Sequence, residues 1–281
     1  MGVSSTRRWC VVVCLMVCWK VTCGSEALNY NGGSVLAMAG KECAVVVVDQ
    51  RFGVGNSLIG EEATRVLDCG ERSVVAMRGL QGDVQTFMED IDARLRLRWI
   101  QEDSDGDGPR FSIEPDKLSA MISMMLYGSR SRRRSMPYYL EPVIAGVKKS
   151  GEVFVCGQDS LGAQLASTSY VVAGTATQSL HGACEALYEP DLDPEALVDR
   201  AVKCMAAGLN RDCLGGKRVV VHLVSKNNKL KAFHRPLLFH KTVPAKTSAG
   251  RTQDDDEKNQ HHQAEEETKK TAAEVPTTTT A

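Results

Sequence analysis

Residues 34–49 read SVLAMAGKECAVVVVD, and this stretch decides which fold the chain can adopt. Its first part alternates weakly, Gly40 and Lys41 supply a turn, and residues 43–48 form an apolar run that ends at Asp49. A continuous run rich in valine is typical of a strand that is buried on both faces. The stretch therefore predicts a β-hairpin whose second strand lies in the core.

Outward from this hairpin, strand-like and helical blocks follow one another as far as His240. Short apolar runs predict strands over 72–77, 138–147, 152–156, 169–173, 218–224 and 229–233. Apolar residues at steps of three and four predict helices over 83–100, 114–127, 177–187 and 194–209. Asp83 and Asp193 are the expected N-caps, and Pro115 stands at a helix start. Because the helices come in pairs between groups of strands, we expect an α+β sandwich with two antiparallel sheets between paired helices.

The composition is that of a globular protein. The chain has 281 residues, of which 43% are hydrophobic and 25% charged, and its formal net charge is −1. These values exclude collagen, a wholly disordered chain and a multi-span membrane protein. Near-zero charge also argues against a protein whose main role is to bind nucleic acid or an anionic membrane.

The ten cysteines contain no CxxC pair. Four lie in the first 23 residues, and the other six are widely scattered along the body of the chain. No histidine cluster accompanies them. Buried free thiols are therefore expected in preference to disulfides or a zinc site.

The two ends differ in composition from the body. Residues 1–27 contain two arginines, an apolar run and a small-residue stretch, which is the pattern of a secretory signal peptide. A removed extension, a wrongly assigned start of the coding sequence and a retained membrane anchor remain open alternatives. Residues 241–281 are charged, contain no aromatic residue and are expected to be disordered. We therefore expect residues 28–240 to form the folded domain.

Five motifs in this domain occur in a recognisable order. They are YNGG at 30–33, VDQRFG at 48–53, GLQGDVQ at 79–85, YYLEPVIAG at 138–146 and NRD at 210–212. Together they resemble the proteasome beta-subunit family of N-terminal-nucleophile hydrolases, over about residues 28–238. The resemblance implies a four-layer αββα sandwich that requires no cofactor.

The same resemblance implies a noncatalytic member of the 20S core particle. Its partners would be other alpha and beta subunits in a hetero-oligomer of stacked rings, with no nucleic acid and no stable membrane association. The implied location is the cytoplasm and nucleus, with which the signal-like residues 1–27 conflict.

The family's catalytic positions are altered in this chain. In active members, cleavage after a glycine frees a threonine, and an aspartate and a lysine follow it at intervals of sixteen residues. Counting from Asp49 places Gly33 at the threonine and Arg65 at the lysine. Asp212 aligns with a second family aspartate, but Gly215 replaces the serine that normally follows it. We therefore expect no catalytic residue, with Gly33, Asp49, Arg65 and Asp212 as a vestigial site and with Asp49 and Arg65 forming a partly buried ion pair.

A hydrolase that uses Ser34 is the enzymatic alternative. Cleavage between Gly33 and Ser34 would make this serine amino-terminal. Its register is off by one against Asp49, which turns its side chain to the opposite face of a strand.

An acidic loop offers a second alternative function, because Asp103, Asp105, Asp107 and Glu114 satisfy the spacing of an EF-hand calcium loop. A proline directly after the loop glycine and an arginine at the eighth position depart from that pattern. A solvated loop is therefore favoured, with calcium binding left as an alternative.

A basic loop over residues 129–135 contains four arginines but no aromatic residue for base stacking. A solvated or subunit-facing loop is preferred to one that contacts RNA.

Overall fold

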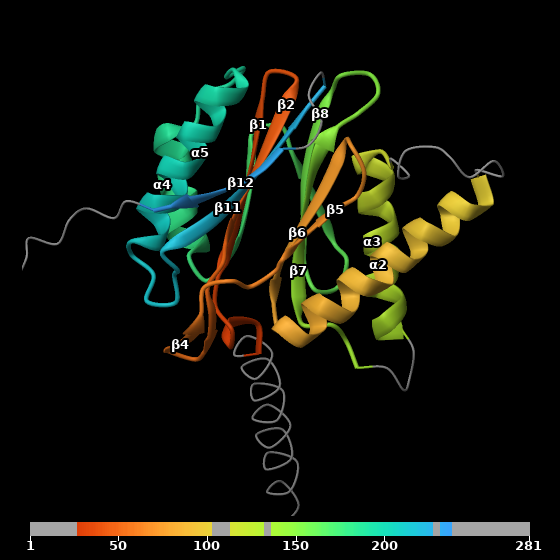
Figure 1. Cartoon of the computed structure of the whole chain (residues 1–281), viewed down its shortest axis with the longest axis horizontal. Helices are drawn as coiled ribbons and strands as arrows, with labels where there is room; N and C mark the ends of the chain where they lie inside the picture. Colours follow the sequence, from red (N-terminus) through yellow and green to blue (C-terminus); the bar gives the residue numbers. More distant parts are fainter. Residues whose placement is uncertain (1–26, 103–112, 132–135, 227–230, 238–281) are drawn as a thin grey trace, which may run out of the picture. The chain divides into compact units, whose positions relative to one another are not determined.

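A computed structural model of the chain describes residues 27–102, 113–131, 136–226 and 231–237. Two five-stranded antiparallel sheets form the centre of this part of the chain (Figure 1). A separate two-stranded hairpin joins Phe52–Val54 (β3) to Ser57–Gly60 (β4).

The first sheet has the strand order β10-β1-β2-β11-β12. Its members are Ser34–Gly40 (β1), Cys43–Asp49 (β2), Tyr170–Gly174 (β10), Arg218–Ser225 (β11) and Lys231–Pro236 (β12). The hairpin predicted from residues 34–49 is confirmed, with Gly40 opposite Cys43 at its closed end.

The second sheet has the order β5-β6-β7-β8-β9. Its members are Val66–Asp68 (β5), Ser73–Gly79 (β6), Leu140–Val147 (β7), Val153–Gln158 (β8) and Gln164–Ser167 (β9). The predicted strands at 72–77, 138–147 and 152–156 are present, and each observed end lies within two residues of the expected one.

Four helices cover the outer faces of the sheets in pairs. They are Gln81–Glu102 (α2), Pro115–Ser131 (α3), Thr177–Leu187 (α4) and Pro194–Leu209 (α5). Helices α4 and α5 pack on the first sheet, and α2 and α3 pack on the second (Figure 1). The structure thus confirms the α+β fold as a four-layer αββα sandwich.

Three apolar cores hold the layers together, and β2 contributes to two of them. Val46 and Val48 lie in the core between the sheets, whereas Val45 and Val47 contact the α4–α5 layer. Successive side chains on a strand point to opposite faces, so a valine run can serve both cores at once. This arrangement explains why β2 contains no polar residue before Asp49.

Several expectations need correction. Helix α2 begins at Gln81, so Asp83 is not its N-cap, and the Asp83 carboxylate instead accepts a hydrogen bond of 2.7 Å from the Tyr139 backbone N–H. Asp193 does occupy the N-cap position of α5, but its side chain makes no capping hydrogen bond. Among the six cysteines that the structure describes, Cys213 is exposed, while the other five are buried free thiols as expected.

The termini assigned from sequence lie almost entirely outside the described residues, as do residues 227–230 between the last two strands. No helix in the described part of the chain has the length and apolar composition that a membrane span requires.

Candidate functional site

Gly33 directly precedes β1 and has a backbone φ of +96°, a conformation that side-chain-bearing residues rarely adopt. A Cβ atom placed here would overlap Nη1 of Arg65 and lie 2.8 Å from its Cζ. The Arg65 guanidinium therefore occupies the space into which a side chain at position 33 would project.

Arg65 is almost completely buried, with 1% of its surface exposed. Its Nη2 donates to the Arg51 carbonyl oxygen at 2.7 Å, and its Nε donates to Gln81 Oε1 at 3.3 Å. Nη1, the atom over Gly33, has no hydrogen-bond partner among the described residues. Burial lowers the pKa of Arg65 to about 10 against the opposing attraction of Asp49, which leaves the guanidinium charged at neutral pH.

Asp49 ends β2 and is fully buried. Its two carboxylate oxygens accept backbone hydrogen bonds from Arg51 and Gly216, both at 2.9 Å. Burial raises the pKa of this carboxyl, although the two hydrogen bonds and the nearby arginines oppose the rise.

The expected direct ion pair between Asp49 and Arg65 is wrong. The carboxylate is engaged by backbone N–H groups and the guanidinium by a carbonyl and an amide oxygen, so the two side chains attract each other through space without sharing a hydrogen bond. Both residues are also almost completely buried, whereas partial burial was expected.

Asp212 lies in the turn after α5. Its carboxylate accepts a hydrogen bond from the Thr175 hydroxyl and another, of 2.9 Å, from the Leu214 N–H. The Thr175 N–H in turn donates to the Gly33 carbonyl oxygen at 3.3 Å. Asp212, Thr175 and Gly33 are therefore linked, although they are distant in sequence.

Ser34 is fully buried as the first residue of β1. Its hydroxyl oxygen accepts a hydrogen bond of 3.0 Å from the Ala176 N–H, just before α4. Gly174 closes over it, because a Cβ there would lie 2.6 Å from Ser34 Oγ. A peptide substrate would have no access to this hydroxyl in the described conformation.

Sequence reasoning missed Arg51, Gln81 and Gly216 as members of this site. Arg51 is 3% exposed, and its guanidinium donates to the carbonyl oxygens of Asn31 at 3.1 Å and Gly55 at 3.0 Å. It lies inside the VDQRFG motif, which was the one signal that could have found it. Gly216 carried no such signal, since its role depends on its approach to Asp49.

In chemical terms, the site holds two buried guanidinium groups and one buried carboxylate around a glycine. Gly33 supplies no hydroxyl, and a charged guanidinium cannot accept a proton. The arrangement can order the backbone at the start of β1, and position 33 itself carries no side-chain nucleophile.

Of the calcium-loop residues, Asp103, Asp105 and Asp107 lie outside the described residues. Glu114 is described, and its carboxylate pairs with Lys117 Nζ at 2.9 Å and accepts a hydrogen bond from the Lys149 N–H at 3.4 Å. Within the described ranges, no group of three or more His, Cys, Asp or Glu residues is placed to hold a metal ion. The expected basic loop over 129–135 is wrong at its start, because residues 129–131 are the last residues of α3, and residues 132–135 lie outside the described ranges.

Comparison with known families places these features in context. Residues 29–224 match the model of the proteasome subunit family, and the chain belongs to this family. It is similar to the proteasome subunit beta type-3 of Trypanosoma brucei brucei, with 39% identity over 201 residues that cover 71% of this chain and 93% of the relative. It is also 34% identical to the beta type-3 subunit of Picea mariana, over 72% of this chain and 94% of the relative. The beta type-3 subunit of Drosophila melanogaster shows 34% identity over 71% of this chain and 93% of its own length.

Proposed function

We propose that this chain is a noncatalytic, structural beta subunit of the 20S proteasome core particle, in the beta type-3 position. The observation that carries the proposal is the Arg65 guanidinium over Gly33. It fills the space that a nucleophilic side chain would need, and the glycine provides none. The names of the similar beta type-3 subunits support the assigned position.

The chain's contribution to protein degradation is then architectural. Its domain, residues 28–240, joins other alpha and beta subunits in stacked rings in the cytoplasm and nucleus, with no nucleic-acid or membrane partner. The leader at 1–27 and the tail at 241–281 lie outside this structural role.

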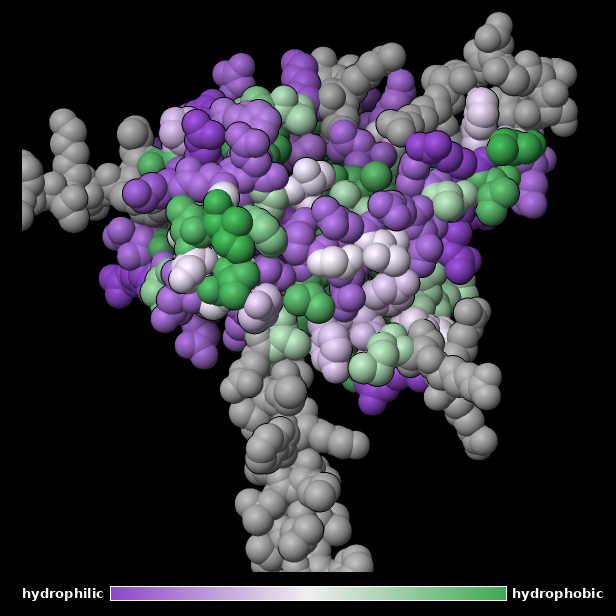
Figure 2. All heavy atoms as spheres, turned by 60° about the horizontal axis from the view of Figure 1, so that its bottom comes forward, coloured by the Kyte–Doolittle hydropathy of each residue, from purple (hydrophilic) through white to green (hydrophobic). Residues whose placement is uncertain are grey.

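An uncovered apolar patch supports a role in assembly. Val54, Leu58 and Ile59 on the β3–β4 hairpin are 39%, 55% and 59% exposed. Figure 2 shows hydrophobic side chains gathered on the face that carries this hairpin. Clustered exposed apolar groups of this kind mark surfaces that a partner covers.

The alternative hydrolase would need Ser34 as its nucleophile. Its complete burial and its hydrogen bond to Ala176 argue against that use. Burial would also block the peptide carbonyl from approaching within the reach that nucleophilic attack requires.

The test is to purify core particles that contain a tagged copy of this chain and to treat them with a threonine-directed covalent inhibitor. We expect the chain to be present in the particles and to carry no adduct on the peptide that contains Gly33 and Ser34. The active subunits of the same particles serve as the internal positive control. An adduct at either residue, or absence of the chain from the particles, contradicts the proposal.

A further inference from the structure

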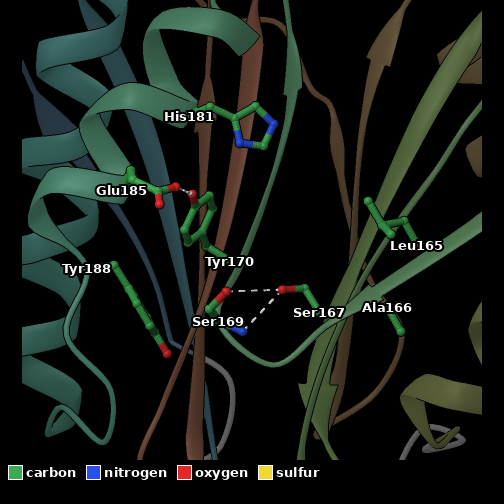
Figure 3. Close-up of a pocket in the computed structure, with 8 residues that line it drawn as sticks. All are labelled: Leu165, Ala166, Ser167, Ser169, Tyr170, His181, Glu185 and Tyr188. Carbon is green, nitrogen blue, oxygen red and sulfur yellow. Dashed lines mark hydrogen bonds between the residues drawn. The ribbon is translucent and has the colours of Figure 1, made fainter.

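A pocket of about 480 Å³ lies where the edges of the two sheets meet beside α4 (Figure 3). Strand β9 is an edge of the second sheet, and β10 is an edge of the first. The short connection between them is closed by a contact of 3.2 Å between the hydroxyls of Ser167 and Ser169. Within the described residues, both strands therefore present backbone groups that no sheet neighbour uses.

One wall of the pocket is aromatic and acidic. Tyr170 from β10 stands beside His181 and Tyr188, with its ring centroid 5.9 Å from each of theirs. The Tyr170 hydroxyl donates to Glu185 Oε2 at 3.1 Å, which holds the carboxylate beside the hydroxyl end of the ring (Figure 3). The electron-rich ring faces and the carboxylate both favour a positive charge.

The opposite wall is apolar. Leu165 on β9 faces the aromatic wall across the pocket, and its neighbour Ala166 also lines it (Figure 3). Leu165 is 70% exposed, which leaves an aliphatic surface open to contact from a partner. No lysine or arginine lines the pocket, so no described side chain of this kind neutralises Glu185 from inside it.

We propose that this pocket receives a lysine or arginine side chain from an extended segment of a neighbouring subunit in the core particle. The aliphatic stem packs on Leu165, and the charged head lies over the Tyr170 ring next to Glu185. Long basic side chains combine these two properties, an apolar stem and a cationic end. An extended segment suits the site because free strand edges on both walls can pair with its backbone. The inference rests on the proposed function, since the partner is another subunit of the same particle.

The test uses assembled particles in which a photoreactive benzoylphenylalanine replaces the exposed His181. After irradiation, mass spectrometry identifies the segment captured from a neighbouring chain. The same measurement is made with Glu185→Gln added, and with Glu89→Gln added as the control. Both glutamates are exposed helix residues, but Glu89 lies on α2 and does not line the pocket.

We expect the captured segment to belong to a neighbouring subunit. It should carry a lysine or arginine within about two residues of the crosslinked position. Glu185→Gln should lower the crosslink yield roughly two- to fivefold, in keeping with the modest strength of exposed charge and cation–π contacts, and Glu89→Gln should leave it unchanged. Capture of a segment without a basic residue, no capture in intact particles, or a yield that does not respond to Glu185→Gln overturns the inference and leaves the proposed function standing. Failure of the unlabelled parent chain to enter the particle overturns both.

Discussion

Gly33 and Arg65 each depend on the other. The arginine can lie over the start of β1 only because position 33 has no Cβ, and the positive φ of Gly33 adds a second reason for glycine. This coupling joins two single residues that lie 32 positions apart in the sequence. It can be measured by a double-mutant cycle.

Gly33→Ala should destabilise the chain by about 2–5 kcal/mol, because the new methyl group overlaps Arg65 and the backbone conformation is strained. In Gly33→Ala/Arg65→Ala the overlap is absent, so the combined loss should fall short of the sum of the single losses by roughly 1–3 kcal/mol. Urea unfolding of the purified chains gives the four values. Gly82→Ala is the control, since nothing lies within 4 Å of a Cβ built there. Additive single losses would show that the two residues do not share space.

Asp49→Ala should cost about 2–5 kcal/mol, because the buried N–H groups of Arg51 and Gly216 both lose their acceptor. Asp49→Asn retains one acceptor oxygen and should cost less. Adding Arg65→Met to Asp49→Ala should recover only a minor part of the loss, since the two N–H groups remain without a partner. Full recovery in urea unfolding would instead support a direct ion pair between Asp49 and Arg65.

At the scale of elements, the β3–β4 hairpin depends on contacts outside itself. Its strands have three and four residues, too few to be stable alone. Arg51 ties the hairpin to the start of the domain by donating to the carbonyl oxygens of Asn31 and Gly55. The hairpin is thereby held with its apolar side chains directed outward next to the Gly33 site.

Ile59→Asp should leave the stability of the isolated chain within about 0.5 kcal/mol of the parent, because this side chain is 59% exposed. Incorporation into core particles should nevertheless fall, since a charge would then be buried against a neighbour. Quantitative mass spectrometry of purified particles measures the incorporation. Gln85→Asp, an exposed change on α2, is the matched control and should have no effect. Equal incorporation of the two variants would mean that the hairpin patch stays uncovered.

At the scale of the whole molecule, the segment beyond the domain can be tested by truncation. Removing residues 241–281 should leave folding and incorporation largely intact, because the segment has little apolar content and no aromatic residue. Full-length and truncated chains are compared in sedimented particles. Loss of the truncated chain from the particle fraction would show that the tail contacts a neighbouring subunit.

Long, periodic elements were the part of the fold that the sequence predicted well. The hairpin at residues 34–49 and the four helices that cover the sheets were found, because burial imposes a regular apolar pattern on elements of this length. Strands β3, β4, β5 and β9 were not predicted. They have only three or four residues, which is too short for a two-residue period to stand out, and their pairing depends on neighbours elsewhere in the chain.

The sequence by itself determined the layered α+β fold, the family and the absence of a hydroxyl at position 33, since each is written in residue type, order or spacing. Only the tertiary structure decided how the charges at the site are partnered. Asp49 accepts a hydrogen bond from Gly216, 167 positions away, rather than one from Arg65. Hydrogen bonds depend on distances of about 3 Å and on direction, and such geometry emerges only when β2, the turn after α5 and the segment before β5 pack together.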